Sequence, residues 1–110
     1  MGRHGARQDD FQAEVVQEDG RPVVAVHGEI DAATSGRFKE CIDEALALDT
    51  RLVIDLADSS FMDSTGLSAL IRAYNDTGRV KEAVVLRSVG DPIRRTLEIS
   101  GVSQLVTVVP

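Results

Sequence analysis

The chain has 110 residues, enough for one domain with a buried core and no disulfide or structural metal. Its composition, 43% hydrophobic but only 4% aromatic, predicts the aliphatic core of an α/β protein. The net charge of −6 argues against a nucleic-acid-binding surface, and no apolar run approaches the roughly 18 residues of a membrane span. We therefore expect a cytoplasmic domain at residues 11–110, preceded by a flexible leader at 1–10.

The first half of the domain predicts two paired strands, a helix and an interior strand. Residues 11–16 alternate apolar and polar side chains, and turn residues at 18–21 separate them from a second apolar segment at 22–27, which predicts a hairpin. From residue 32 the pattern becomes helical. Its expected inward side chains are Phe38, Cys41, Ile42, Ala45 and Leu48. The apolar segment at 51–56 predicts a strand covered on both faces.

The second half continues the alternation of helices and strands. A helix is predicted to begin near Ser64 and to end at Gly78, with a strand at 83–87 after it. Its expected inward side chains are Leu67, Leu70, Ile71 and Tyr74. Asp91 as the cap and Pro92 in the first turn predict a third helix, which turns Ile93 and Leu97 inward and ends before Gly101.

A last strand is predicted at 105–109. The expected fold is therefore a single sheet of about five strands, mostly parallel, with an N-terminal hairpin strand and helices packed on the sheet. The loops after parallel strands emerge at the carboxyl edge of the sheet, where α/β folds usually place their sites. Three segments should meet there, at 28–32, 59–66 and 88–92.

The segment at 59–66 contains the candidate site. Ser64 should lie at the first turn of its helix with an accessible hydroxyl, and the helix dipole tolerates an added anion there. Asp63 would repel part of that charge, and Gly66 leaves the backbone open to an approaching kinase. Taken alone, these residues also suit simple helix capping.

The segment "FMDSTGL" at 61–67, preceded by "GEID" at 28–31, resembles the STAS domains, specifically the single-domain anti-sigma factor antagonists of bacteria. The resemblance extends from residue 11 to residue 110. It implies that Ser64 is the phosphorylated residue, with Thr65 a less favoured acceptor.

The same resemblance implies a regulatory cycle without catalysis by this chain. The unphosphorylated antagonist binds an anti-sigma factor, itself a serine kinase that uses ATP, and so releases a sigma factor. Phosphorylation ends the binding, and a metal-dependent PP2C-type phosphatase restores it. No cofactor is implied for the antagonist itself, and the free chain is expected to be a monomer. The residues expected to face the partner are Glu29, Asp31, Met62, Asp63, Thr65, Gly66 and Leu67.

Other interpretations remain open. The chain could be a STAS accessory subunit of a lipid-transport ABC system, or part of a larger signalling assembly.

Single residues also have alternative roles. Glu29 and Asp31 are weak metal ligands by themselves, and turn or capping duty is commoner for Asp31. A serine hydrolase is disfavoured because Ser64 does not lie in the Gly-x-Ser-x-Gly pattern of a nucleophile elbow. Cys41 is expected to be a buried structural thiol.

Overall fold

The computed structural model describes residues 10–110 as a five-stranded sheet in the order β1-β2-β3-β4-β5. The leader predicted at 1–10 falls almost entirely outside the described residues. The strands are β1 (Gln12–Glu18), β2 (Arg21–His27), β3 (Leu52–Asp58), β4 (Val84–Arg87) and β5 (Thr107–Val108). The helices are α2 (Ser35–Leu48), α3 (Ser64–Asp76) and α4 (Asp91–Ser100), with short 3-10 turns η1 (Lys81–Ala83) and η2 (Val102–Gln104).

The sheet confirms the predicted mixture of one hairpin and parallel strands. β1 pairs antiparallel with β2, whereas the pairs β2-β3, β3-β4 and β4-β5 are all parallel. The hairpin turns at Asp19 and Gly20, whose φ angles of 52° and 80° are both positive. That pair of angles belongs to the tight turn whose twist matches two antiparallel strands. The α/β fold class is therefore confirmed.

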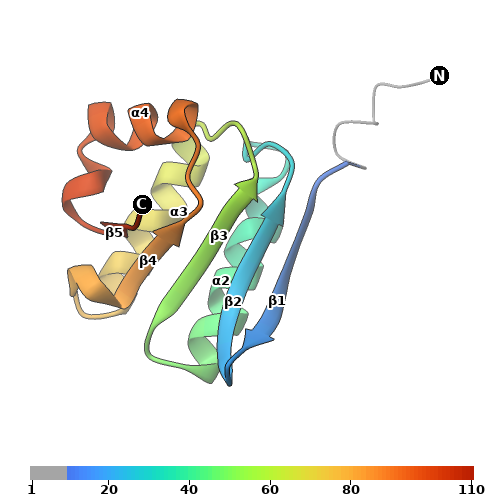
Figure 1. The fold of residues 1–110 in the computed structure, drawn as a ribbon, viewed down its shortest axis with the longest axis vertical. Coiled ribbons are helices and arrows are strands. Elements are labelled where there is room, and N and C mark those ends of the chain that lie inside the picture. Colours follow the sequence, from blue (N-terminus) through green and yellow to red (C-terminus); the bar gives the residue numbers. More distant parts are fainter. Residues whose placement is uncertain (1–9) are drawn as a thin grey trace.

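The helices cover one face of the sheet, and the other face is open. Figure 1 shows α2 and α3 behind the strands, and a single hydrophobic cluster joins β1 to β4 with all three helices. The prediction that the strand at 51–56 is covered on both faces was wrong. In β3 the side chains alternate, with Leu52, Ile54 and Leu56 buried while Val53 and Asp55 are partly exposed.

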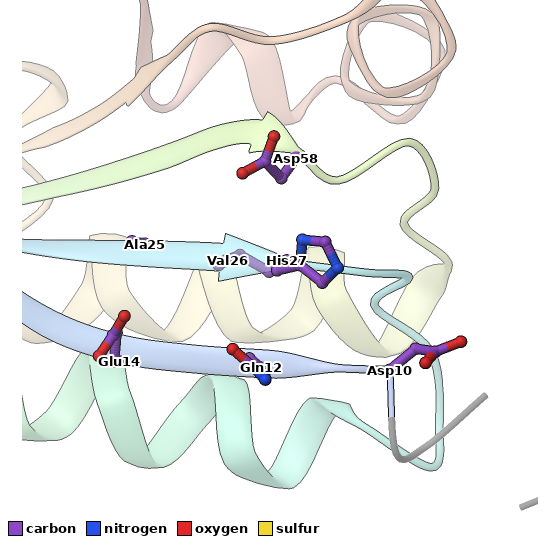
Figure 2. A pocket seen from close by; sticks show the side chains of 7 residues that line it. All are labelled: Asp10, Gln12, Glu14, Ala25, Val26, His27 and Asp58. Carbon is purple, nitrogen blue, oxygen red and sulfur yellow. The ribbon is translucent and has the colours of Figure 1, made fainter. Parts of the chain in front are cut away.

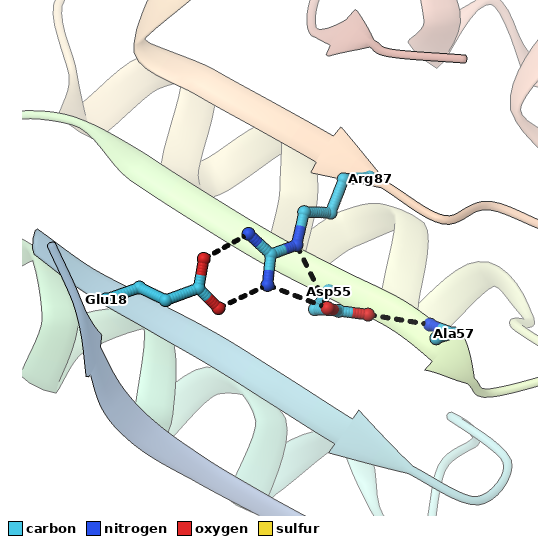
Figure 3. Close-up of polar contacts among 4 residues, drawn as sticks. All are labelled: Glu18, Asp55, Ala57 and Arg87. Atoms are coloured by element: carbon cyan, nitrogen blue, oxygen red, sulfur yellow. Dashed lines mark hydrogen bonds and ion pairs between the residues drawn. The ribbon is translucent and has the colours of Figure 1, made fainter.

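An ionic network occupies the open face (Figure 3). Arg87 on β4 donates hydrogen bonds to both carboxylate oxygens of Glu18 on β1, one of them at 2.6 Å. Its Nε donates to Asp55 on β3 at 2.9 Å, and the same carboxylate accepts the N–H of Ala57 at 2.9 Å. The hydrogen bonds that Arg87 donates to Glu18 and to Asp55 raise the pKa of Arg87, and the hydrogen bond from Arg87 lowers the pKa of Glu18. Three strands are thus joined by one guanidinium.

The first helix begins later than the predicted residue 32. The carboxylate of Asp31 accepts the N–H groups of Ala33 and Thr34 at 3.0 and 3.2 Å, which holds a turn there and delays the helix to Ser35. The predicted inward side chains are buried except for Leu48, which is 61% exposed at the end of α2. Cys41 is buried in this helix as expected, and burial raises the pKa of its thiol.

α3 begins at Ser64 as predicted, and Gly78 follows its cap with a positive φ of 83°. Its inward face is rotated from the prediction, because small residues pack closest to the core. Ile71 is 38% exposed, and Leu67 and Tyr74 are half-buried. The buried residues of α3 are Gly66, Ala69, Leu70 and Ala73.

α4 confirms the prediction for the third helix, with Ile93 and Leu97 fully buried. Its cap residue is Gly90, so that Asp91 already belongs to the first turn instead of preceding it. The final strand is shorter than the predicted 105–109. The left-handed Gly101 directs the chain into η2, which ends at Gln104, so that only Thr107–Val108 pair with β4.

Candidate functional site

Two of the three predicted loops are joined by backbone hydrogen bonds at the carboxyl edge of the sheet. The N–H of Gly28 donates to the carbonyl of Asp58 at 2.9 Å. Further along, the N–H of Ile30 donates to the carbonyl of Phe61 at 2.9 Å, and the N–H of Asp63 donates to the carbonyl of Ile30 at 3.0 Å. Beyond the ends of β2 and β3, the chain therefore continues as a short parallel bridge that leads directly into α3.

Two buried hydroxyls stabilise these loops, and the sequence analysis did not single them out. Ser59 donates to the carbonyl of Gly28 at 2.7 Å. Thr34 donates to the carbonyl of Glu29 at 2.7 Å and accepts the N–H of Asp31 at 2.9 Å. The only sequence signal for this loop-stabilising role is a Ser or Thr near the end of a strand. Many exposed Ser and Thr residues occupy such positions too, so the signal is not specific. The partner of Ser59 lies in the other loop, whereas those of Thr34 lie three and five residues earlier in its own segment.

Asp63 caps the first turn of α3. Its carboxylate accepts the N–H of Thr65 at 2.8 Å and also the Thr65 hydroxyl. The hydrogen bond from that hydroxyl, with smaller contributions from the N–H groups of Thr65, Gly66 and Ala32, lowers the pKa of Asp63. Asp63 is therefore ionised at neutral pH, and its negative charge is fixed beside the start of the helix.

Ser64 is the first residue of α3, and its side chain is exposed. Within residues 10–110 its hydroxyl makes no hydrogen bond. The Thr65 hydroxyl differs in both respects, because it is half-buried and donates to Asp63. The two adjacent hydroxyls are thus distinguished by geometry, because the Ser64 hydroxyl is exposed without a hydrogen bond within residues 10–110 and the Thr65 hydroxyl is bound to Asp63.

Gly66 and Met62 lie beneath this surface. A Cβ on Gly66 would lie 2.5 Å from Cγ of Met62 and 2.9 Å from Cγ2 of Ile30, closer than any normal contact. Met62 is only 2% exposed. The expectation that these two residues face a partner does not fit their burial, nor does Gly66 serve to open the backbone. Its missing side chain instead allows α3 to pack directly on the joined loops.

Glu29 and Asp31 are both half-buried in the first loop. The Asp31 carboxylate is occupied by its own turn, where it accepts the N–H groups of Ala33 and Thr34. In residues 10–110, no group of three or more His, Cys, Asp or Glu side chains is placed to bind a metal ion. The turn-capping alternative is thus the role that the geometry gives to Asp31.

One hollow lies on the open face of the sheet, away from the loops described above. Figure 2 shows Gln12 and Glu14 of β1 beside His27 of β2 and Asp58 of β3. Its volume is about 480 Å³, and its lining includes none of residues 59–66.

The third predicted loop comes close to the site through α4. Val89 is buried, and the start of α4 borders an open hollow of about 700 Å³ together with Phe61 and the edge of Met62. Phe61 is 45% exposed, which is unusual for an aromatic side chain, and it stands three residues before Ser64. All three loops therefore contribute to one end of the molecule.

Among the described residues, none of the helices has the length and apolar character that crossing a membrane requires.

Comparison with known proteins places this geometry in a family. An anti-sigma-F factor antagonist of Mycobacterium tuberculosis is 35% identical over 98 residues, which are 87% of this chain and 79% of that protein. An anti-sigma-B factor antagonist of Listeria monocytogenes is 33% identical over 86 residues, 77% of this chain and 75% of the relative.

A solved structure agrees with the sequence relatives. The crystal structure of an anti-sigma factor antagonist from Mycobacterium paratuberculosis is 31% identical and has a TM-score of 0.80, covering 93% of this chain and 87% of that one. The family model described as "STAS domain" matches residues 12–110, from the first strand to the end of the chain. The chain belongs to the STAS domain family.

Proposed function

We propose that this protein is an anti-sigma factor antagonist that is switched off by phosphorylation of Ser64. In this proposal, the unphosphorylated chain binds an anti-sigma factor that is also a serine kinase, and thereby releases a sigma factor. The names of the two relatives and of the solved structure support the class of function. A PP2C-type phosphatase would remove the phosphate and restore binding.

The observation that supports Ser64 as the acceptor is the contrast between the two neighbouring hydroxyls. The Ser64 side chain is exposed and makes no hydrogen bond within residues 10–110. The Thr65 side chain is instead half-buried, and its hydroxyl is held against Asp63, so that a kinase reaches it less easily than it reaches Ser64. We therefore propose Ser64 as the acceptor and Thr65 as part of its support.

The local charges explain how one phosphate could end binding. A phosphoryl group adds about −1.5 to −2 charges at neutral pH. It would stand next to the ionised Asp63, so that a surface which is already negative becomes strongly negative. Charge placed against a closely packed partner can weaken binding by about 3 kcal/mol, which is roughly two orders of magnitude in Kd. The fold itself need not change, because the Ser64 hydroxyl contributes no hydrogen bond to it.

The test is phosphate transfer from candidate kinases. Purified protein is incubated with ATP and each kinase, and intact mass is measured before the modified residue is mapped. We expect one added phosphate on the wild type and none on Ser64→Ala, while Ser68→Ala, which alters another exposed serine of α3, is modified normally.

Binding measurements complete the test. Ser64→Ala should remain bound to the kinase in the presence of ATP, and Ser64→Asp should bind about a hundredfold more weakly with an unchanged circular dichroism spectrum. Phosphate on another residue with Ser64 dispensable would refute the assignment. Stable association with an ABC ATPase, without any phosphate acceptance, would instead favour the transport-subunit alternative.

A further inference from the structure

The hollow between Phe61 and α4 has the features of a docking groove. It is open, has a volume of about 700 Å³, and is bordered on one side by the exposed ring of Phe61 and on the other by Pro92 and the outer face of α4. Exposed aromatic side chains next to a hollow are frequent centres of protein interfaces. This groove begins three residues from Ser64, yet its lining does not include that serine.

The charges of the groove differ from those of the molecule as a whole. The chain has a net charge of −6, but Arg94 and Arg95 both line the groove, beside Asp91 and Glu98. Neither arginine forms a salt bridge or side-chain hydrogen bond within residues 10–110. By contrast, Arg37, Arg72 and Arg87 are all paired with carboxylates. The guanidinium donors of α4 are therefore available to carboxylates from outside.

We propose that this groove docks the kinase partner of Ser64 through an acidic segment that inserts an apolar side chain beside Phe61. The inference rests on the proposed function and adds a contact surface to it. The carboxylates of that segment would pair with Arg94 and Arg95, and the apolar side chain would fill the hollow. The groove gives the kinase a fixed contact from which Ser64 lies within reach, whereas phosphate on Ser64 controls the adjoining part of the interface.

The experiment measures Kd without ATP, using the full chain and the kinase identified by phosphate transfer to Ser64. Phe61→Ala should weaken binding about tenfold, as loss of an aromatic anchor does. The double variant Arg94→Glu, Arg95→Glu should weaken it further, and its association rate should depend less on salt than that of the wild type.

Matched controls come from the same chain. Arg21→Glu, Arg51→Glu makes the same charge change on two exposed arginines at the amino edge of the sheet, and Leu48→Ala truncates an exposed apolar side chain at the end of α2. Both should bind within twofold of the wild type. Thermal unfolding of every variant shows whether the fold is kept.

The outcomes separate this inference from the proposed function. If Ser64→Asp loses binding while the groove variants bind like their controls, the groove proposal is refuted and the switch stands. If the control pair weakens binding as much as the α4 pair, net charge alone acts, and the groove is again refuted. If the unphosphorylated wild type does not bind the kinase at all, the proposed function and the groove proposal are both refuted.

Discussion

At the scale of single residues, Gly66 lies where α3 packs against Met62 and Ile30 of the two joined loops. Its φ is not positive, so backbone freedom does not explain the glycine. The reason is space, because Met62 and Ile30 occupy the volume that a Cβ would need. Close packing at Gly66 therefore fixes the first turn of α3, and with it Ser64, against the core of the protein.

Gly66→Ala tests this packing. The gain in helix propensity is about 1 kcal/mol, but overpacking at such distances costs about 1–3 kcal/mol, and we expect a net loss of stability. Urea unfolding measures it. Gly36→Ala is the control in the first turn of α2, where the added Cβ has no atom within 4 Å apart from its chain neighbours and its own helix backbone, and it should be neutral or stabilising. A Gly66→Ala protein as stable as Gly36→Ala would contradict the packing argument.

Asp63 allows a prediction about pH. Replacement by Ala removes the helix cap and should lower the free energy of unfolding by about 0.5–2 kcal/mol at pH 7. The folded-state pKa is lowered, chiefly by the Thr65 hydroxyl, so the ionised carboxylate contributes fully above the unfolded pKa of about 4. That contribution is lost as the pH falls through the folded pKa.

Asp63→Asn is the matched variant, since Asn also caps helices but does not titrate. The stability difference between the wild type and Asp63→Asn, measured by urea unfolding from pH 7 to pH 2, should shrink below about pH 4. A difference that stays constant over this range would mean that the charge of Asp63 does not stabilise the first turn of α3.

At the scale of secondary-structure elements, the open face of the sheet is joined by Arg87. Isolated surface ion pairs contribute little, but here one guanidinium binds two carboxylates from two other strands, with bidentate geometry toward Glu18. The pair with Asp55 is the better shielded, because that side chain is 23% exposed against 49% for Glu18. The network therefore links β1, β3 and β4 without a covering helix.

Arg87→Met keeps the apolar stem and removes the charge. We expect it to lower the unfolding temperature, and to do so more than Glu18→Gln, because it also leaves Asp55 without its partner. Raising NaCl to about 1 M should lower the unfolding temperature of the wild type more than that of Arg87→Met, since salt screens the exposed part of the network. Equal melting temperatures for the two variants would show that Asp55 needs no counter-charge.

At the scale of the whole molecule, all three helices and the first four strands share one hydrophobic cluster. We therefore expect residues 11–110 to unfold in a single cooperative transition. Far-ultraviolet circular dichroism reports the backbone, and fluorescence of Tyr74, the only tyrosine in a chain without tryptophan, reports α3. The two urea transitions should coincide. An earlier loss of the Tyr74 signal would mean that α3 opens separately from the sheet.

Most of the element order could be predicted because local patterns encode it. Alternating side chains predicted β1, the helical stripe predicted α2 up to Ala45, and Pro92 predicted the start of α4. Asp63 and Ser64 could be placed at the start of a helix because a short run of polar residues before an apolar helix is a local signal. Their capping and exposure needed no distant partner to be predicted.

The chain's sequence by itself determined its α/β class, its strand and helix order, and the position of Ser64 at a helix start. Only the tertiary structure decided that Gly66 faces Ile30, that Ser59 and Thr34 are buried, and that the sheet is covered on one face. The physical reason is that each of these depends on how the folded loops, strands and helices pack against one another. Residue patterns within one segment specify its own periodicity, whereas burial and close approach depend on the neighbour that folding supplies.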